Sequence, residues 1–147
     1  MRGKSEVSML TEAQASALIA MLKESARETA FSWFSNARDD EVFISADDGD
    51  IEFVLTLSRN PFEIRLHFRT KLNNIGLMRI DGAPYHANPD GTELRNTPHI
   101  HIFREGHGLD WAEPIDWFWP DRPTETLERF LVELNARFKG GIQLTTV

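Results

Sequence analysis

Side chains capable of chemistry are concentrated between Arg79 and Gly106. This segment holds three of the five histidines of the chain, together with two aspartates and three arginines. It also contains a loop rich in proline, glycine and asparagine, which are residues that favour turns. We therefore expect an active or binding site of this protein to lie in this segment.

The alternation of apolar and polar residues indicates which of these side chains share a face. Residues 62–69, 75–81 and 99–104 read as strands, in which successive side chains point to opposite sides of a sheet. If the aliphatic residues face inward, polar residues from three strands lie together on an uncovered side of the sheet, named here the polar face. Its predicted members are Arg65, His67, Arg69, Arg79, Asp81, His99 and His101. A one-residue error in register would reverse this assignment.

Two kinds of chemistry fit this cluster. Histidines two residues apart on a strand lie about 7 Å apart on the same side, so His99 and His101 can bind one metal ion. His86, Asp81 or Asp90 would complete the ligand set, and histidine with carboxylate suits a divalent metal such as zinc or iron. Alternatively, the histidines act without metal as general base and general acid in phosphodiester cleavage. Nearby arginines would then bind the phosphate.

Each interpretation assigns roles to particular residues. The candidate catalytic residues are His99, His101, Arg79, Asp81 and His86. The candidate substrate-binding residues are Arg104, Arg65, Arg69 and His67. The candidate metal ligands are His99, His101, His86 and Asp90, the last two from a loop that can fold over the polar face. A structural alternative also stays open, in which the histidines are hydrogen-bonded residues of a polar sheet and Asn88-Pro89-Asp90-Gly91 is only a turn.

Composition limits the class of protein. A chain of 147 residues predicts a single domain over residues 1–147, with a flexible tail at residues 1–8. The absence of cysteine excludes disulfides and thiolate nucleophiles and favours a cytoplasmic location. No apolar run is long enough to cross a membrane. The net charge of −7 argues against a general nucleic-acid binder, although residues 54–105 carry seven basic and five acidic side chains.

The elements that must position the cluster follow from periodicity and capping. The order of segments predicts an α+β fold, an antiparallel sheet of four to five strands with N-terminal and C-terminal helices packed on one face. Thr11-Glu12-Ala13-Gln14 matches a capping box, so a helix is expected from there to about Phe34. Further strands are expected at residues 41–46 and 51–58. A second helix is expected from Asp121-Arg122-Pro123-Thr124 to the glycine pair Gly140-Gly141.

The motifs of this segment resemble those of a family of small uncharacterised bacterial and prophage proteins. The shared pattern is Arg79-x-Asp81, then His86-x-Asn88-Pro89-Asp90-Gly91, then Pro98-His99-x-His101-x-x-Arg104-Glu105-Gly106. This resemblance implies a mobile-element protein and carries no activity with it. A looser likeness connects Arg79, Asp81, His86, His99 and His101 with toxins of toxin–antitoxin pairs. It implies a small protein acting on RNA or nucleotides.

Three functional hypotheses remain open from the sequence. The first is a small nuclease-like enzyme that uses the histidine, arginine and aspartate cluster. The second is a non-enzymatic acidic inhibitor or binding module for a host or phage protein, such as a component of a defence complex, recognised through Asp47, Asp48, Asp50 and residues 111–119. The third is an assembly protein that dimerises through the polar face.

Overall fold

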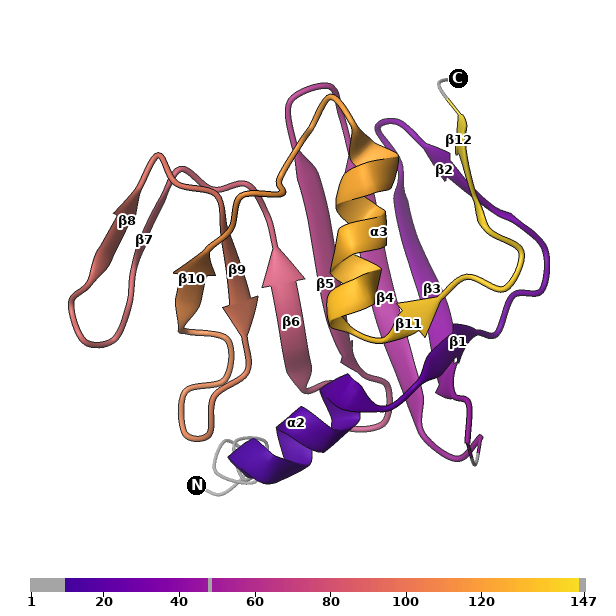
Figure 1. Cartoon of the computed structure of the whole chain (residues 1–147), viewed down its shortest axis with the longest axis horizontal. Helices are drawn as coiled ribbons and strands as arrows, with labels where there is room; N and C mark the ends of the chain where they lie inside the picture. The colour runs from indigo at the N-terminus through magenta and orange to yellow at the C-terminus, as the bar shows by residue number, and fades with distance from the viewer. Residues whose placement is uncertain (1–9, 48, 146–147) are drawn as a thin grey trace.

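The protein is built around one mixed β-sheet. The computed structural model describes residues 10–47 and 49–145, so Asp48 and the tail expected at residues 1–8 lie outside the described residues. Eight strands form the sheet in the order β10-β9-β6-β5-β4-β3-β1-β11 (Figure 1). All neighbours are antiparallel except β1 and β11, which are parallel. The strands are β1 (Lys23–Ser25), β3 (Arg38–Ser45), β4 (Glu52–Arg59), β5 (Ile64–Thr70), β6 (Gly76–Ile80), β9 (His99–Ile102), β10 (Ala112–Pro114) and β11 (Ala136–Arg137).

Two helices and two small sheets complete the described fold. Helix α2 spans Glu12–Ala20 and helix α3 spans Pro123–Glu133. Strand β2 (Phe31–Phe34) pairs in parallel with β12 (Ile142–Thr145). Strands β7 (Tyr85–Ala87) and β8 (Glu93–Arg95) form an antiparallel hairpin. In Figure 1 α3 lies across β4 and β5, and the β7–β8 hairpin stands beside the β9–β10 edge.

The prediction of a four- to five-stranded antiparallel sheet with two terminal helices is wrong. The sheet has eight strands, one pair is parallel, and the two helices are short. The three strands that the prediction omitted, β1, β10 and β11, are only two or three residues long. Segments this short show no periodicity, and their pairing partners are distant in the chain.

The N-terminal helix is shorter than expected. Its capping box is present, because Thr11 Oγ1 accepts from the backbone N–H of Gln14 and Gln14 Oε1 accepts from that of Thr11. The helix nevertheless ends at Ala20 instead of continuing to Phe34. Residues 31–34 alternate between buried and more exposed, with Phe31 1% and Trp33 0% exposed. This period of two belongs to a strand, and it outweighs the local alanine content.

The C-terminal helix also ends earlier than the sequence suggests. Pro123 occupies its first position, as expected for a residue with a fixed φ and no N–H. The helix ends at Glu133, and Asn135 then adopts a left-handed conformation with φ 52°. Asparagine is the residue other than glycine that tolerates this conformation best. The glycine pair at 140–141 therefore does not end the helix and follows β11.

The apolar core lies between the sheet and α3. Leu55, Leu66 and Ile80 of the sheet are fully buried, as are Leu127 and Phe130 of the helix. Because these sheet residues point toward α3, their polar neighbours in each strand point to the opposite side of the sheet. The core thus fixes the orientation of the polar face.

Candidate metal centre

Strand register brings polar side chains into a row across the polar face. His67 of β5 is paired with Arg79 of β6, and Arg79 is paired with His101 of β9. On the core side, Phe68 is paired with Met78 and Met78 with Ile102. Directly opposed residues of antiparallel strands have their Cβ atoms about 4.5–5.5 Å apart. The arrangement of faces predicted from alternation is therefore the one in the structure.

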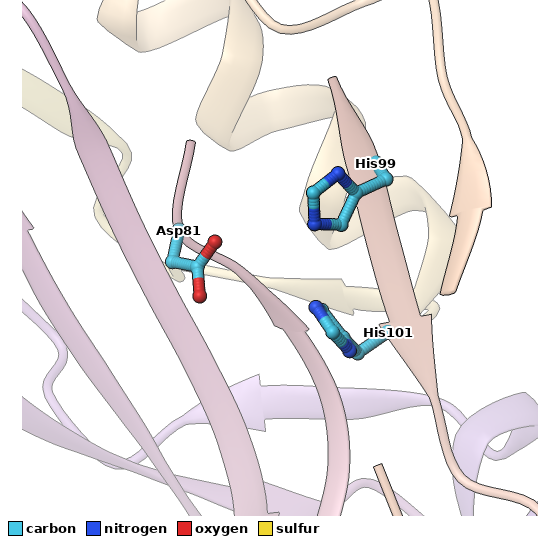
Figure 2. Close-up of side chains that lie close together, drawn as sticks. All are labelled: Asp81, His99 and His101. Atoms are coloured by element: carbon cyan, nitrogen blue, oxygen red, sulfur yellow. The ribbon is translucent and has the colours of Figure 1, made fainter. Parts of the chain in front are cut away.

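Two histidines and one aspartate converge at the end of this row. Asp81 follows the last residue of β6, while His99 and His101 project from β9 (Figure 2). One potential ligand atom from each of the three residues lies within 4.8 Å of the others. In Figure 2 the two imidazole rings and the carboxylate face a common space. Such a set of two imidazoles and one carboxylate is typical of zinc and non-haem iron sites.

Backbone carbonyl groups orient both imidazoles. His99 Nδ1 lies 2.8 Å from the carbonyl oxygen of Thr97, and His101 Nδ1 lies 2.8 Å from that of Leu109. A carbonyl oxygen can only accept, so the proton of each neutral ring sits on Nδ1. The Nε2 atoms keep their lone pairs, and His99 Nε2 is buried without a hydrogen-bond partner. Metal-binding histidines commonly have this second hydrogen bond, which fixes tautomer and ring direction.

The two histidines are buried rather than uncovered. His99 is 3% and His101 2% exposed, which differs from the expectation of an open sheet face. Burial lowers the pKa of His101 to about 4, although its hydrogen bond to the Leu109 carbonyl acts in the opposite direction. His101 is therefore neutral at physiological pH, which is the protonation state that binds metal and a poor one for a general acid.

His86 covers the histidine pair from the β7–β8 hairpin. Its ring centroid lies 4.7 Å from that of His101 and 5.6 Å from that of His99, and the rings of His99 and His101 are 5.1 Å apart. His86 Nε2 lies 2.8 Å from the carbonyl oxygen of Asp110, so this nitrogen carries a proton. In the neutral ring the other nitrogen, Nδ1, is then an acceptor. The structure thus brings His86 to the predicted cluster, next to the three residues whose ligand atoms converge.

The Asn88-Pro89-Asp90-Gly91 segment is a turn that also attaches the hairpin to the sheet. Gly91 N–H donates to the Asn88 carbonyl, and Asp90 Oδ1 accepts from the N–H of Thr92. The Asn88 side chain makes two buried hydrogen bonds with the backbone of Ala112 in β10, at 2.8 and 3.1 Å. Asp90 is exposed and does not belong to the group of three converging ligands. Sequence reasoning recognised the turn and missed the role of Asn88.

A cavity of about 290 Å³ opens beside Asp81 on the polar face. Its charged walls come from Arg38, Arg65, Arg79 and Asp81, with His67 alongside. Arg79 Nε lies 3.7 Å from an Asp81 carboxylate oxygen and is buried without a hydrogen bond. The pKa of His67 is lowered by burial and by Arg69 and Arg79. The positive charge in this cavity therefore comes from its arginines, and guanidinium groups of this kind can bind an anion.

Arg38 was missed by the sequence reasoning, and Arg69 and Arg104 are not among the residues that line this cavity. Arg38 begins β3, three residues before the predicted start of that strand. Arg38 lies on the same face of β3 as Asp40, opposite the buried Glu41 and Phe43. Arg69 donates to Thr56 Oγ1 on the polar face. Arg104 lies over the ring of Trp111, with 4.2 Å between its Cζ atom and the ring centroid, in a different groove.

The residues of the binding-module hypothesis are mostly packing residues. Trp117 is 4% exposed and belongs to the core, and Phe118 and Trp119 pack against it. Trp33 is also fully buried. Asp47 and Asp50 are exposed, and Asp48 lies outside the described residues. Within the described part of the chain, neither helix has the length and apolarity needed to cross a membrane.

Fold and site together define a class of protein: a mixed β-sheet whose polar face carries two buried histidines and an aspartate beside an arginine-lined cavity. The chain belongs to a family of unknown function, DUF6978, whose family model matches residues 10–136. The matched range includes all the converging ligands and the cavity. Neither the curated proteins nor the solved structures gave a significant match.

Proposed function

We propose that this protein is a small metal-dependent enzyme that acts on phosphodiester bonds, with Asp81, His99 and His101 as its metal ligands. The observation that carries this proposal is the state of the two imidazoles. Both Nδ1 atoms are bonded to backbone carbonyls, and one potential ligand atom from each of His99, His101 and Asp81 lies within 4.8 Å of the others. Three protein ligands leave a coordination position open, as catalytic zinc sites do.

The surrounding residues supply the other functions that such an enzyme needs. A bound divalent metal supplies a Lewis acid and lowers the pKa of a water molecule. Arg79 has a buried Nε–H without a partner next to Asp81, and a phosphate oxygen would satisfy this donor. His86 lies against the histidine pair, with 4.7 Å between its ring centroid and that of His101, so its neutral ring can accept a proton there. His101, held neutral by burial, supports metal binding better than metal-free acid catalysis.

Metal content of the purified protein tests the proposal directly. We expect near-stoichiometric zinc or iron in the wild type and none in the double variant His99→Ala, His101→Ala. Asp81→Asn removes one charged ligand and should weaken binding by more than about 10-fold, since even outer-sphere partners of metal ligands contribute that much. His107→Ala is the matched control, because His107 is exposed and should leave metal content unchanged.

Activity is measured on bis(p-nitrophenyl) phosphate with the metal-loaded protein. Hydrolysis should disappear with a chelator and return when the metal is restored. Wild-type protein that binds neither zinc nor iron after dialysis against each ion would overturn the metal centre. Bound metal without turnover of any phosphodiester would overturn the enzymatic part and favour a non-enzymatic binding role.

A further inference from the structure

The anion cavity continues beyond the candidate metal centre. A second cavity, of about 330 Å³, lies next to it and shares three lining residues with it, Arg38, Ser58 and Arg65. The shared residues form a cross-strand row, because Arg38 is paired with Ser58 and Ser58 with Arg65. The two cavities thus make one trough from Asp81 across β5 and β4 to β3, named here the arginine groove. It crosses three strand spacings, about 14 Å, which is long enough for more than one phosphate group.

Charge in the arginine groove opposes that of the whole molecule. Arginines at positions 38, 59, 65 and 79 line it, against two carboxylates, Glu63 and Asp81. The chain as a whole carries a net charge of −7. Arg65 pairs with Glu63 at 2.7 Å and Arg38 with Asp40 at 3.6 Å, but both arginines are about two-thirds exposed. Exposed ion pairs contribute little free energy, so phosphate groups can compete for these guanidinium groups.

An exposed aromatic residue stands at the outer end of the groove. Phe62 is 85% exposed in the turn between β4 and β5. Its neighbours Asn60 and Glu63 both line the outer cavity. Asn60 Oδ1 accepts from the backbone N–H groups of Phe62 and Glu63, at 2.8 and 2.9 Å, so the turn is internally braced. The ring is not part of the core cluster, and an exposed ring in a braced turn that borders the outer cavity is a platform on which a base can stack.

We propose that the arginine groove binds a single-stranded nucleic acid, with Phe62 stacking on a base and the arginines contacting consecutive phosphates. A single strand fits better than a duplex because an unpaired base can leave its stack to meet Phe62. The proposal deepens the proposed function, since the inner end of the groove is the cavity beside Asp81. RNA and DNA strands share this chemistry, and the experiment separates them.

Binding is measured by fluorescence anisotropy with labelled single strands of about 12 nucleotides, within the site sizes of known strand-binding folds. RNA and DNA strands of the same sequence are compared with a duplex and a mononucleotide, using metal-free protein so that nothing is cleaved. We expect a strand to bind at least 10-fold more tightly than the mononucleotide or the duplex. Affinity should fall as salt rises, because phosphate contacts release counterions.

Paired variants separate the groove from general surface effects. Phe62→Ala should weaken strand binding by about 5-fold or more, the lower end of base–aromatic stacking. Its control is Leu72→Ala, an apolar residue 91% exposed in the turn between β5 and β6. Arg38→Ala should weaken binding and reduce the salt slope by about 1. Its control is Arg129→Ala on α3, an exposed arginine that also has one carboxylate partner. Both controls should bind as the wild type does.

The outcomes distinguish this inference from the proposed function. Equal loss of strand binding in the control variants, or equal affinity for the duplex, would overturn the nucleic-acid groove. Failure of strand binding in a protein that holds metal and cleaves bis(p-nitrophenyl) phosphate would overturn the groove and leave the enzyme. Strand binding by a protein that cannot be loaded with zinc or iron would keep the groove and remove the metal centre. Metal content of the Phe62 and Arg38 variants should equal that of the wild type.

Discussion

At the scale of single residues, the site depends on which nitrogen of each histidine is occupied. His99 and His101 both have Nδ1 bonded to a backbone carbonyl. The Nε2 atoms are therefore the ones left to bind a metal ion. Residue type and spacing predicted two imidazoles on one side of a strand. The carbonyl partners belong to Thr97, beside the strand, and Leu109, beyond it. The second of these contacts depends on how the chain returns after β9.

Lys23 is a buried residue whose role the sequence does not suggest. Its side chain is inaccessible to solvent, and its Nζ donates to the carbonyls of Ile19, Met21 and Leu134 at 2.7–2.8 Å. Burial lowers its pKa to about 7. Lys23→Met should lower the free energy of unfolding by about 3 kcal/mol or more, because three carbonyls lose their donor, at about 1–3 kcal/mol for each unsatisfied group.

Urea unfolding at pH 7 measures this effect. Lys71→Met is the control, since Lys71 is about half exposed in a surface pair with Glu52 and should change stability by less than about 0.5 kcal/mol. Equal stability of the Lys23 and Lys71 variants would show that the ammonium group is not needed to hold the ends of α2 and α3.

At the scale of elements, the β7–β8 hairpin covers the histidine pair and is attached to β10 by the side chain of Asn88. Asn88 makes both hydrogen bonds to Ala112 of β10, and this attachment places His86 against the site. Asn88→Ala should therefore loosen the hairpin without unfolding the sheet. We expect faster amide hydrogen exchange in residues 85–95 and unchanged exchange in β4 and β5.

The matched control for the hairpin is Asp90→Ala in the same turn. Asp90 is exposed and its side chain bonds only locally, to Thr92, so exchange across the hairpin should stay close to that of the wild type. If Asn88→Ala and Asp90→Ala change exchange equally, the turn itself and not its attachment to β10 would hold the hairpin in place.

At the scale of the whole molecule, buried neutral histidines make stability depend on pH. Burial lowers the pKa of His101 to about 4 and also lowers that of His67. In the unfolded chain a histidine has a pKa of about 6.5, so the unfolded state binds more protons between these values. The stabilisation is complete above pH 6.5 and is lost as pH falls toward 4, by about 3 kcal/mol for His101.

Urea unfolding of the metal-free protein between pH 7.5 and 4.5 tests this expectation. His101→Gln should show a smaller loss of stability over that range than the wild type, because glutamine does not titrate. His107→Gln should retain the full wild-type slope, since His107 is exposed. Parallel curves for all three proteins would mean that His101 is protonated as readily in the folded state as in the unfolded chain.

The sequence by itself determined the features that depend on local geometry. Side chains alternate along any strand, so the shared face of His67, Arg79 and His101 was predictable, as was the turn at Asn88-Pro89-Asp90-Gly91. Tertiary structure alone decided the rest. The parallel pairing of Lys23 with Ala136, the burial of the histidines under the hairpin and the cavity that Arg38 and Asp81 both line all join residues far apart in the chain. No local pattern encodes such contacts, because they form only when distant segments bury the same core.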